Sequence, residues 1–198
     1  MSRATHTRLW ALALLPALVQ ALLPTVAHAA PIDTVLSALA AEAAAPIERG
    51  RLFILRGEVA EVYYIDRVAP GRFRLIKNPR QGGSELVIVD GMQWARPGRG
   101  RWQRSPARDT DRLVPSMTDL FRAGLSRMVE QAEPDGGRSV TGMMAWTNGV
   151  RCEGELLMRI QADGLPSLLR FEGVCGGKPF RFRQAFSFAG PLTIMAPE

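Results

Sequence analysis

The stretch CEGELLMRIQADGLPSLLRFEGVC, residues 152–175, begins and ends with the only two cysteines of the chain. Near its centre, Asp163-Gly164 is typical of a tight turn between two strands. When the stretch is folded back at this turn, Cys152 lies opposite Cys175. Because side chains alternate along a strand, the same register places apolar residues opposite each other on the face that carries the cysteines. The sequence therefore predicts an antiparallel hairpin closed by a Cys152–Cys175 disulfide.

The register of this hairpin fixes the pairs within it and can be extended to a third strand. Within the hairpin, Gly154 pairs with Gly173, Leu156 with Phe171, Met158 with Leu169 and Ile160 with Ser167. The other face then carries Glu153, Glu155, Arg159, Gln161, Arg170 and Glu172. A turn at Gly176-Gly177 adds a strand in which Phe180 faces Gly173, Phe182 faces Phe171, Phe186 faces Ser167 and Arg181 faces Glu172. Two tight turns would make the shared strand bond to both neighbours through the same residues. We therefore expect a wider turn over residues 162–165.

The N-terminal segment is typical of a secretory signal peptide. Two arginines precede an apolar run over residues 9–23, and Ala27-His28-Ala29 has the small-x-small pattern of a cleavage site. A membrane anchor is the alternative, but two prolines interrupt the run and the cleavage site follows it. We expect cleavage after Ala29, which leaves residues 30–198 as a single domain. No cysteine follows the apolar run, so no lipid anchor is expected.

Export would place the protein in the periplasm or outside the cell, where disulfides form and persist. The formal charge of the 198-residue chain is +6, and it falls to about +4 when Arg3 and Arg8 leave with the signal peptide. In that compartment a basic surface meets anionic lipid head groups or cell-surface polymers more readily than nucleic acid. A basic surface that is merely solvated is the alternative.

The first segment of the mature chain, PIDTVLSALAAEAAAP, predicts a helix. Asp33 is the expected N-cap and Pro46 the expected end. The expected apolar stripe is Val35, Leu36, Leu39 and Ala43.

A second helix is predicted between Met117 and Val129, where apolar side chains recur at helical spacing. Ser116 and Asp119 resemble a capping box, and Pro134 follows the segment. An amphipathic helix must cover an apolar surface, so we expect this helix to pack on the apolar sheet face and to bury Phe121.

Short strands fill most of the remaining chain: RLFILRGEVAEVYYIDR, GRFRLIKN, SELVIVD, MQWARP, RWQRS and SVTGMMAWT. Turn residues separate them, as in an antiparallel meander. A strict turn at Asn148-Gly149 would place Trp146 on the charged face, so we expect a bulge there.

Catalytic chemistry is sparse in this sequence. The only histidines, His6 and His28, leave with the signal peptide, which removes histidine-based nucleophilic catalysis and metal binding. If the cysteines are bonded, no thiolate remains. We therefore expect no enzyme activity, no cofactor and no metal.

Two features remain as candidate binding sites. The first is the apolar sheet face, which is either plain core or a surface that holds an acyl chain; its expected ligand contacts are Leu156, Met158, Ile160, Leu169, Phe171, Phe182 and Phe186. The facing glycines Gly154 and Gly173, with Ser167, favour open space there. The second is an arginine run with interleaved tryptophans, in which Arg96, Arg99, Arg101 and Arg104 are the expected contacts to an anionic head group. An ordinary solvated hairpin is the alternative for this run.

Four stretches give the chain a resemblance to a known superfamily. APGRFRLI, SELVIVDGMQWARPGRGRW, GLP at residues 164–166 and the final FSFAGPLTIMAP resemble motifs of the LolA-like periplasmic lipoprotein carriers, a group that includes the LppX/LprG lipid carriers and the RseB-type sensors. The resemblance implies an α+β fold: a strongly curved antiparallel half-barrel, with helices covering its concave face and a cavity for acyl chains.

The sequence thus predicts a non-enzymatic, exported lipid- or acyl-chain-binding carrier or sensor. One alternative is a periplasmic adaptor of the same fold that regulates a membrane protein partner. A second alternative is an exported polyanion-binding protein that uses the arginine run. Nucleic acid is not an expected partner.

Overall fold

The computed structural model describes residues 30–69, 71–107 and 117–198. The predicted signal peptide with its cleavage site at Ala29, and the capping residue Ser116, lie outside these residues. No described helix is long and apolar enough to cross a membrane.

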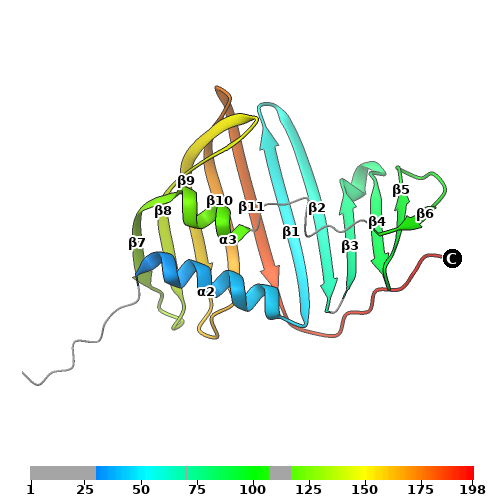
Figure 1. Ribbon diagram of the computed structural model, residues 1–198, viewed down its shortest axis with the longest axis horizontal. Helices are drawn as coiled ribbons and strands as arrows, with labels where there is room; N and C mark the ends of the chain where they lie inside the picture. The colour runs from blue at the N-terminus through cyan, green and yellow to red at the C-terminus, as the bar shows by residue number, and fades with distance from the viewer. Residues whose placement is uncertain (1–29, 70, 108–116) are drawn as a thin grey trace, which may run out of the picture.

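Eleven antiparallel strands within the described residues form one continuous sheet (Figure 1). Their spatial order is β6-β5-β4-β3-β2-β1-β11-β10-β9-β8-β7, so only the β1–β11 contact joins strands distant in sequence. The bounds are β1 (Ile47–Arg56), β2 (Val59–Val68), β3 (Arg72–Lys77), β4 (Glu85–Val89), β5 (Met92–Arg96), β6 (Gln103–Pro106), β7 (Leu125–Ala132), β8 (Arg138–Asn148), β9 (Val150–Ile160), β10 (Pro166–Cys175) and β11 (Lys178–Ser187). A 3-10 turn, η2 (Pro79–Gln81), precedes β4.

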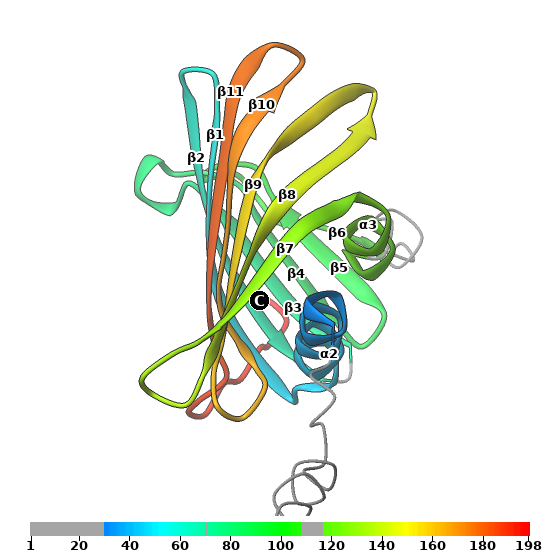
Figure 2. The ribbon, with the colours of Figure 1, turned by 90° about the vertical axis from the view of Figure 1, so that its left-hand side faces the viewer.

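The sheet curves around two helices without closing, because β6 and β7 remain as its edges (Figure 2). Helix α2 (Pro31–Ala44) and helix α3 (Met117–Gly124) both lie on the concave face. They pack on each other and mainly on β7, β8 and β10. The α+β half-barrel expected from the sequence is confirmed.

Helix α2 begins earlier in the chain than predicted. Ala30 is its N-cap and Pro31 occupies the first turn, so Asp33 lies inside the helix and the predicted Asp33 cap is wrong. Proline is favoured there because its missing N–H would have no partner in the first turn. The buried residues are Thr34, Val35, Ala38 and Leu39, so the stripe is rotated from the prediction and Ala43 is exposed.

Helix α3 is shorter than predicted. It ends at Gly124, and residues 125–129, which were expected to continue the helix, belong instead to the edge strand β7. Gly124 abuts β8, because a Cβ there would lie 2.3 Å from the carbonyl oxygen of Ala145. Phe121 is fully buried against the concave face, as expected.

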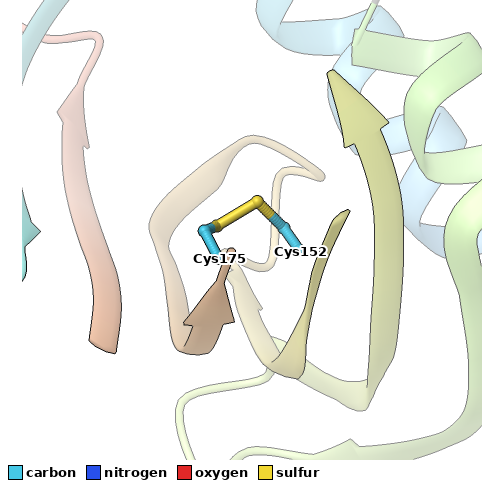
Figure 3. Close-up of a disulfide and its surroundings, with 2 residues drawn as sticks. All are labelled: Cys152 and Cys175. Carbon is cyan, nitrogen blue, oxygen red and sulfur yellow. A yellow bond between two sulfur atoms is a disulfide. The ribbon is translucent and has the colours of Figure 1, made fainter. Parts of the chain in front are cut away.

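The cysteine hairpin follows the predicted register over most of its length. Cys152 pairs with Cys175 and forms the disulfide (Figure 3). The turn is the wider one, because β9 ends at Ile160 and β10 begins at Pro166. The predicted Ile160–Ser167 pair is wrong: the register shifts between Pro166 and Leu168, and Pro166 faces Ile160.

Trp146 lies on the apolar face, but no bulge places it there. The β8–β9 register is continuous, with Asn148 opposite Val150 and the turn centred on Gly149. This turn sets Trp146 opposite Cys152, and its ring meets that of Phe171 edge to face at 4.8 Å between centroids.

The main core lies between the helices and the concave face of β8 to β11. It contains Val35, Leu39 and Phe121 from the helices, and Val140, Met144, Leu156, Met158, Ile160, Leu169 and Phe171 from the sheet. This part of the sheet therefore matches the plain-core alternative.

A second, smaller core lies on the outer face, opposite the helices. There Ile194 of the C-terminal segment packs on Val87 and Val89 of β4. Arg49 donates a hydrogen bond to the carbonyl of Pro191, and Arg72 donates one to the carbonyl of Ile194. Residues 191–194 of the final FSFAGPLTIMAP stretch thus pack on the outer face of the sheet.

Candidate functional site

The concave face continues beyond the helices onto β1 to β4. The strand register shows which side chains share this face: Phe186 faces Gly50, Gly50 faces Ile65, Ile65 faces Leu75, and Leu75 faces Leu86. One row therefore crosses the sheet from β11 to β4. We define the open inner face as the apolar residues of β1 to β4 on this side: Leu52, Ile54, Ile65, Phe73, Leu75, Leu86 and Ile88.

Among the residues that the structure describes, the open inner face is only partly covered. All seven of its side chains are half-buried, and none belongs to the main core or to the outer core. The reason is that α2 and α3 pack mainly on the other half of the sheet. Gly50 contributes no side chain to the row, and a Cβ there would lie 3.4 Å from the Cβ of Ile65. Seven apolar side chains at a surface that solvent reaches have the chemistry to hold a hydrocarbon chain.

The residues predicted from the sequence to contact a ligand divide into two groups. Five of them are between 0% and 6% exposed in the main core: Leu156, Met158, Ile160, Leu169 and Phe171. Phe182 and Phe186 are half-buried at the border between the core and the open inner face. Phe188 stacks on Phe186 with 6.3 Å between centroids. Only Phe182 and Phe186 lie where a ligand on the open inner face would reach them.

The facing glycines do not open a cavity. A Cβ at Gly154 or at Gly173 would lie 2.8 or 2.7 Å from Cζ of Phe171, so this ring covers both glycines. The open space expected beside Gly154 and Gly173 is therefore filled by the Phe171 ring. The glycines are required because the two backbones approach closely, with Glu172 O only 2.3 Å from a Cβ at Gly154.

A polar cluster borders the open inner face near Leu52 and Ile54. Lys77 forms an ion pair with Glu61, and Tyr63 donates a hydrogen bond to the same carboxylate at 2.9 Å. The bonds from Lys77 and Tyr63 lower the pKa of Glu61. A lysine and a tyrosine beside an apolar surface could meet the polar end of a bound molecule.

A second polar cluster fixes the C-terminal end of α2 to the sheet. Arg67 of β2 donates hydrogen bonds to the carbonyls of Glu42, Ala43 and Ala45, and its Nε donates to Glu48 at 3.0 Å. A cation is favoured at this end of a helix because the last carbonyls lack partners. Glu48 is 4% exposed, and Arg67 is the ion-pair partner of its buried carboxylate. Burial, with the nearby Glu48 carboxylate, raises the pKa of Glu42 to about 7.

Raising the pH should loosen this attachment of α2. Glu42 keeps its proton in the folded state up to a pKa of about 7, whereas in the unfolded chain it ionises near its ordinary value of 4.5. The contribution of protonated Glu42 to the free energy of unfolding is therefore complete below the unfolded pKa and is lost as the pH rises through 7. Allowing for solvent screening, the wild type should lose up to about 2 kcal/mol of unfolding free energy between about pH 5 and pH 8. Denaturant titrations should show this loss, and Glu42→Gln should remove it; an unchanged pH dependence in the variant would contradict the assignment.

The four arginines predicted to meet a head group are not on the concave face. Arg96 shares the buried carboxylate of Glu85 with Arg74, at 2.7 Å in each case, and lies over the ring of Trp102. Arg104 lies over Trp94, whose ring packs in the outer core. Arg99 and Arg101 are exposed in the β5–β6 loop. Arg96 and Arg104 thus hold the sheet edge together on the outer face, and Arg99 and Arg101 take no part in this packing. Arg108 and Arg112 of the same run lie outside the described residues.

No group of His, Cys, Asp or Glu side chains suited to a metal ion occurs among the described residues.

No protein-family model and no curated protein matches the sequence. The structure does have a solved neighbour. The fold resembles that of the Mycobacterium tuberculosis lipoprotein LppX. The two structures align with a TM-score of 0.54 over 83% of this chain and 98% of LppX, at 10% sequence identity. At this identity the likeness shows a shared α+β half-barrel fold.

The open inner face was not predicted, although the sequence carries two signals for it. The alternation in RFRLIK places Phe73 and Leu75 on one side of β3. The continuous apolar run LVIV in β4 indicates a strand with apolar contacts on both faces. Val87 and Val89 serve the outer core, which leaves Leu86 and Ile88 for the concave side. These two signals together would have identified the surface.

Proposed function

We propose that this protein is a non-enzymatic carrier or sensor that binds the acyl chain of a lipid or lipoprotein on the open inner face. The single observation that carries this proposal is the set of seven half-buried apolar side chains on the concave side of β1 to β4, outside both cores. A bound hydrocarbon chain along this row would remove apolar surface from water, which contributes about 25 cal/mol per Å².

The shape and the rim of the surface support the same proposal. The row from Phe186 to Leu86 runs across the strands in a concave sheet, so a flexible chain can contact several side chains at once. Lys77 and Tyr63 lie beside it and suit the polar end of such a molecule. The LppX-like fold and the motif resemblance to lipid carriers are consistent with this use.

We propose that the protein works outside the cytoplasm after removal of residues 1–29. The Cys152–Cys175 disulfide supports export, since such bonds persist in oxidising compartments. The absence of histidine after residue 28 supports a binding role rather than catalysis.

The adaptor alternative keeps one supporting observation. β7 is an edge strand, and Val129 on it is 52% exposed, so a partner chain could pair with this edge. The polyanion alternative is weakened, because Arg96 is already neutralised by Glu85.

Displacement of a fluorescent fatty acid from the purified wild type tests the proposal. The carrier function predicts saturable binding that unlabelled fatty acid competes away. An absence of binding, in protein that also carries no co-purified lipid by native mass spectrometry, would favour the adaptor.

A further inference from the structure

The outer face of β10, β11 and β1 carries a second basic cluster that the arginine run does not include. Arg51, Arg170, Arg181 and Arg183 surround an open hollow of about 500 Å³, and Glu172 is its one carboxylate. The two strands that meet here place Arg170 directly opposite Arg183. Like charges in this position repel, so the sheet maintains an unfavourable pair on its surface.

The cluster has little internal neutralisation. Glu172 lies 3.8 Å from Arg170 and 3.9 Å from Arg181, and these side chains are about half exposed. Arg183 has no hydrogen-bond or ion-pair partner among the described residues, and Arg51 only lies over the ring of Tyr64. On the neighbouring strand β9, Glu155 faces Glu172. The two carboxylates therefore lie on the β9 side of the hollow, whereas Arg183 and Arg51 lie on the β1 side.

Exposed aromatic side chains accompany the arginines. Phe53 faces Arg183 across the β1–β11 pair and lines the hollow, and Tyr64 faces Arg51 across β1 and β2. Both rings are 37% exposed. Arginine supplies charged donors for phosphate, and a partly exposed ring beside it can enter the interface region of a bilayer.

We propose that this outer cluster docks the protein on an anionic bilayer by binding the phosphate groups of its lipids. The charge of the hollow favours such a surface, and each basic residue near an anionic membrane contributes about 1 kcal/mol. Docking through the outer face leaves the open inner face, on the other side of the sheet, clear for a ligand. The inference stands independently of the proposed acyl-chain binding.

Vesicle co-sedimentation tests the docking with a matched pair of charge reversals. Arg183→Glu should weaken partition onto phosphatidylglycerol-containing vesicles by roughly tenfold to thirtyfold, because two charge units change at the surface. The variant should remain folded, since the introduced carboxylate would pair with Arg170 and relieve the repulsion. Arg101→Glu changes the net charge equally in the β5–β6 loop and should alter partition by less than about threefold. Wild-type binding should also fall as sodium chloride screens the charges.

Three results would overturn the docking proposal. The first is equal partition of the wild type onto phosphatidylglycerol-containing vesicles and onto pure phosphatidylcholine vesicles. That result would leave an acidic protein partner as the occupant of the cluster. Another is an equal loss for Arg183→Glu and Arg101→Glu, which would assign binding to the loop or to net charge. The third is complete release from vesicles by millimolar-range inorganic phosphate at constant ionic strength, which would indicate a site for a free anion.

Discussion

Replacing Phe121 with aspartate should lower the free energy of unfolding by at least about 4 kcal/mol. Phe121 is 0% exposed between α3 and the sheet, so the substitution removes a buried ring and places a carboxylate among apolar side chains. Loss of a buried phenylalanine alone costs about 3–5 kcal/mol, and an unpaired buried charge adds to that. Urea denaturation followed by circular dichroism measures the effect.

The neighbouring Ala123 provides the control for this measurement. It lies on the same helix but is exposed, so Ala123→Asp introduces the same charge without burial. Its effect should stay within about 1 kcal/mol, which includes an unfavourable acid near a helix C-terminus. Equal midpoints for the two variants would show that α3 does not cover the concave face in solution.

Replacing Phe171 with alanine should cost about 3–5 kcal/mol. Its ring covers Gly154 and Gly173 and lies 4.8 Å from Trp146 and 5.7 Å from Phe182 between centroids, so no nearby side chain is free to fill the space. Phe53→Ala, at a ring that is 37% exposed on the outer face, should cost less than about 1 kcal/mol. If Phe171→Ala were as mild, the region beneath it would already be loosely packed, and a ligand cavity in the main core would have to be reconsidered.

The cysteine hairpin could be predicted in detail because two independent patterns required the same register. The alternating apolar residues and the Cys152–Cys175 alignment agree over every pair from the disulfide to Met158–Leu169. The prediction failed only at Ile160, where the wider loop is joined by a register shift beside Pro166. Proline has no N–H for the ladder, and a bulge there avoids the missing bond.

The second helix was overextended for a physical reason. In β7 the register shifts between Ser126 and Val129, which breaks the alternation of the strand. The bulge lets Leu125 and Met128, three residues apart, both pack on the main core. A bulged strand therefore imitates helical spacing, and single-sequence periodicity does not separate the two cases.

The candidate site depended on facts that the sequence pattern does not contain. Which half of the concave face is covered depends on where α2 and α3 dock, and the apolar residues of both halves look alike in sequence. Similarly, the role of Arg96 depends on the register of the β4–β5 hairpin, which sets Glu85 directly opposite it.

The central claim is that the open inner face, rather than the main core, binds the acyl chain. Leu75 and Ile76 are consecutive on β3 and point to opposite faces, so they form a matched pair for this test. In the fatty-acid displacement assay, Leu75→Trp should weaken binding about tenfold or more by filling the row, while Ile76→Trp should bind like the wild type. Both should melt close to the wild type, since each side chain is only half-buried. Saturable binding that Leu75→Trp leaves unchanged, in a folded protein, would contradict the account.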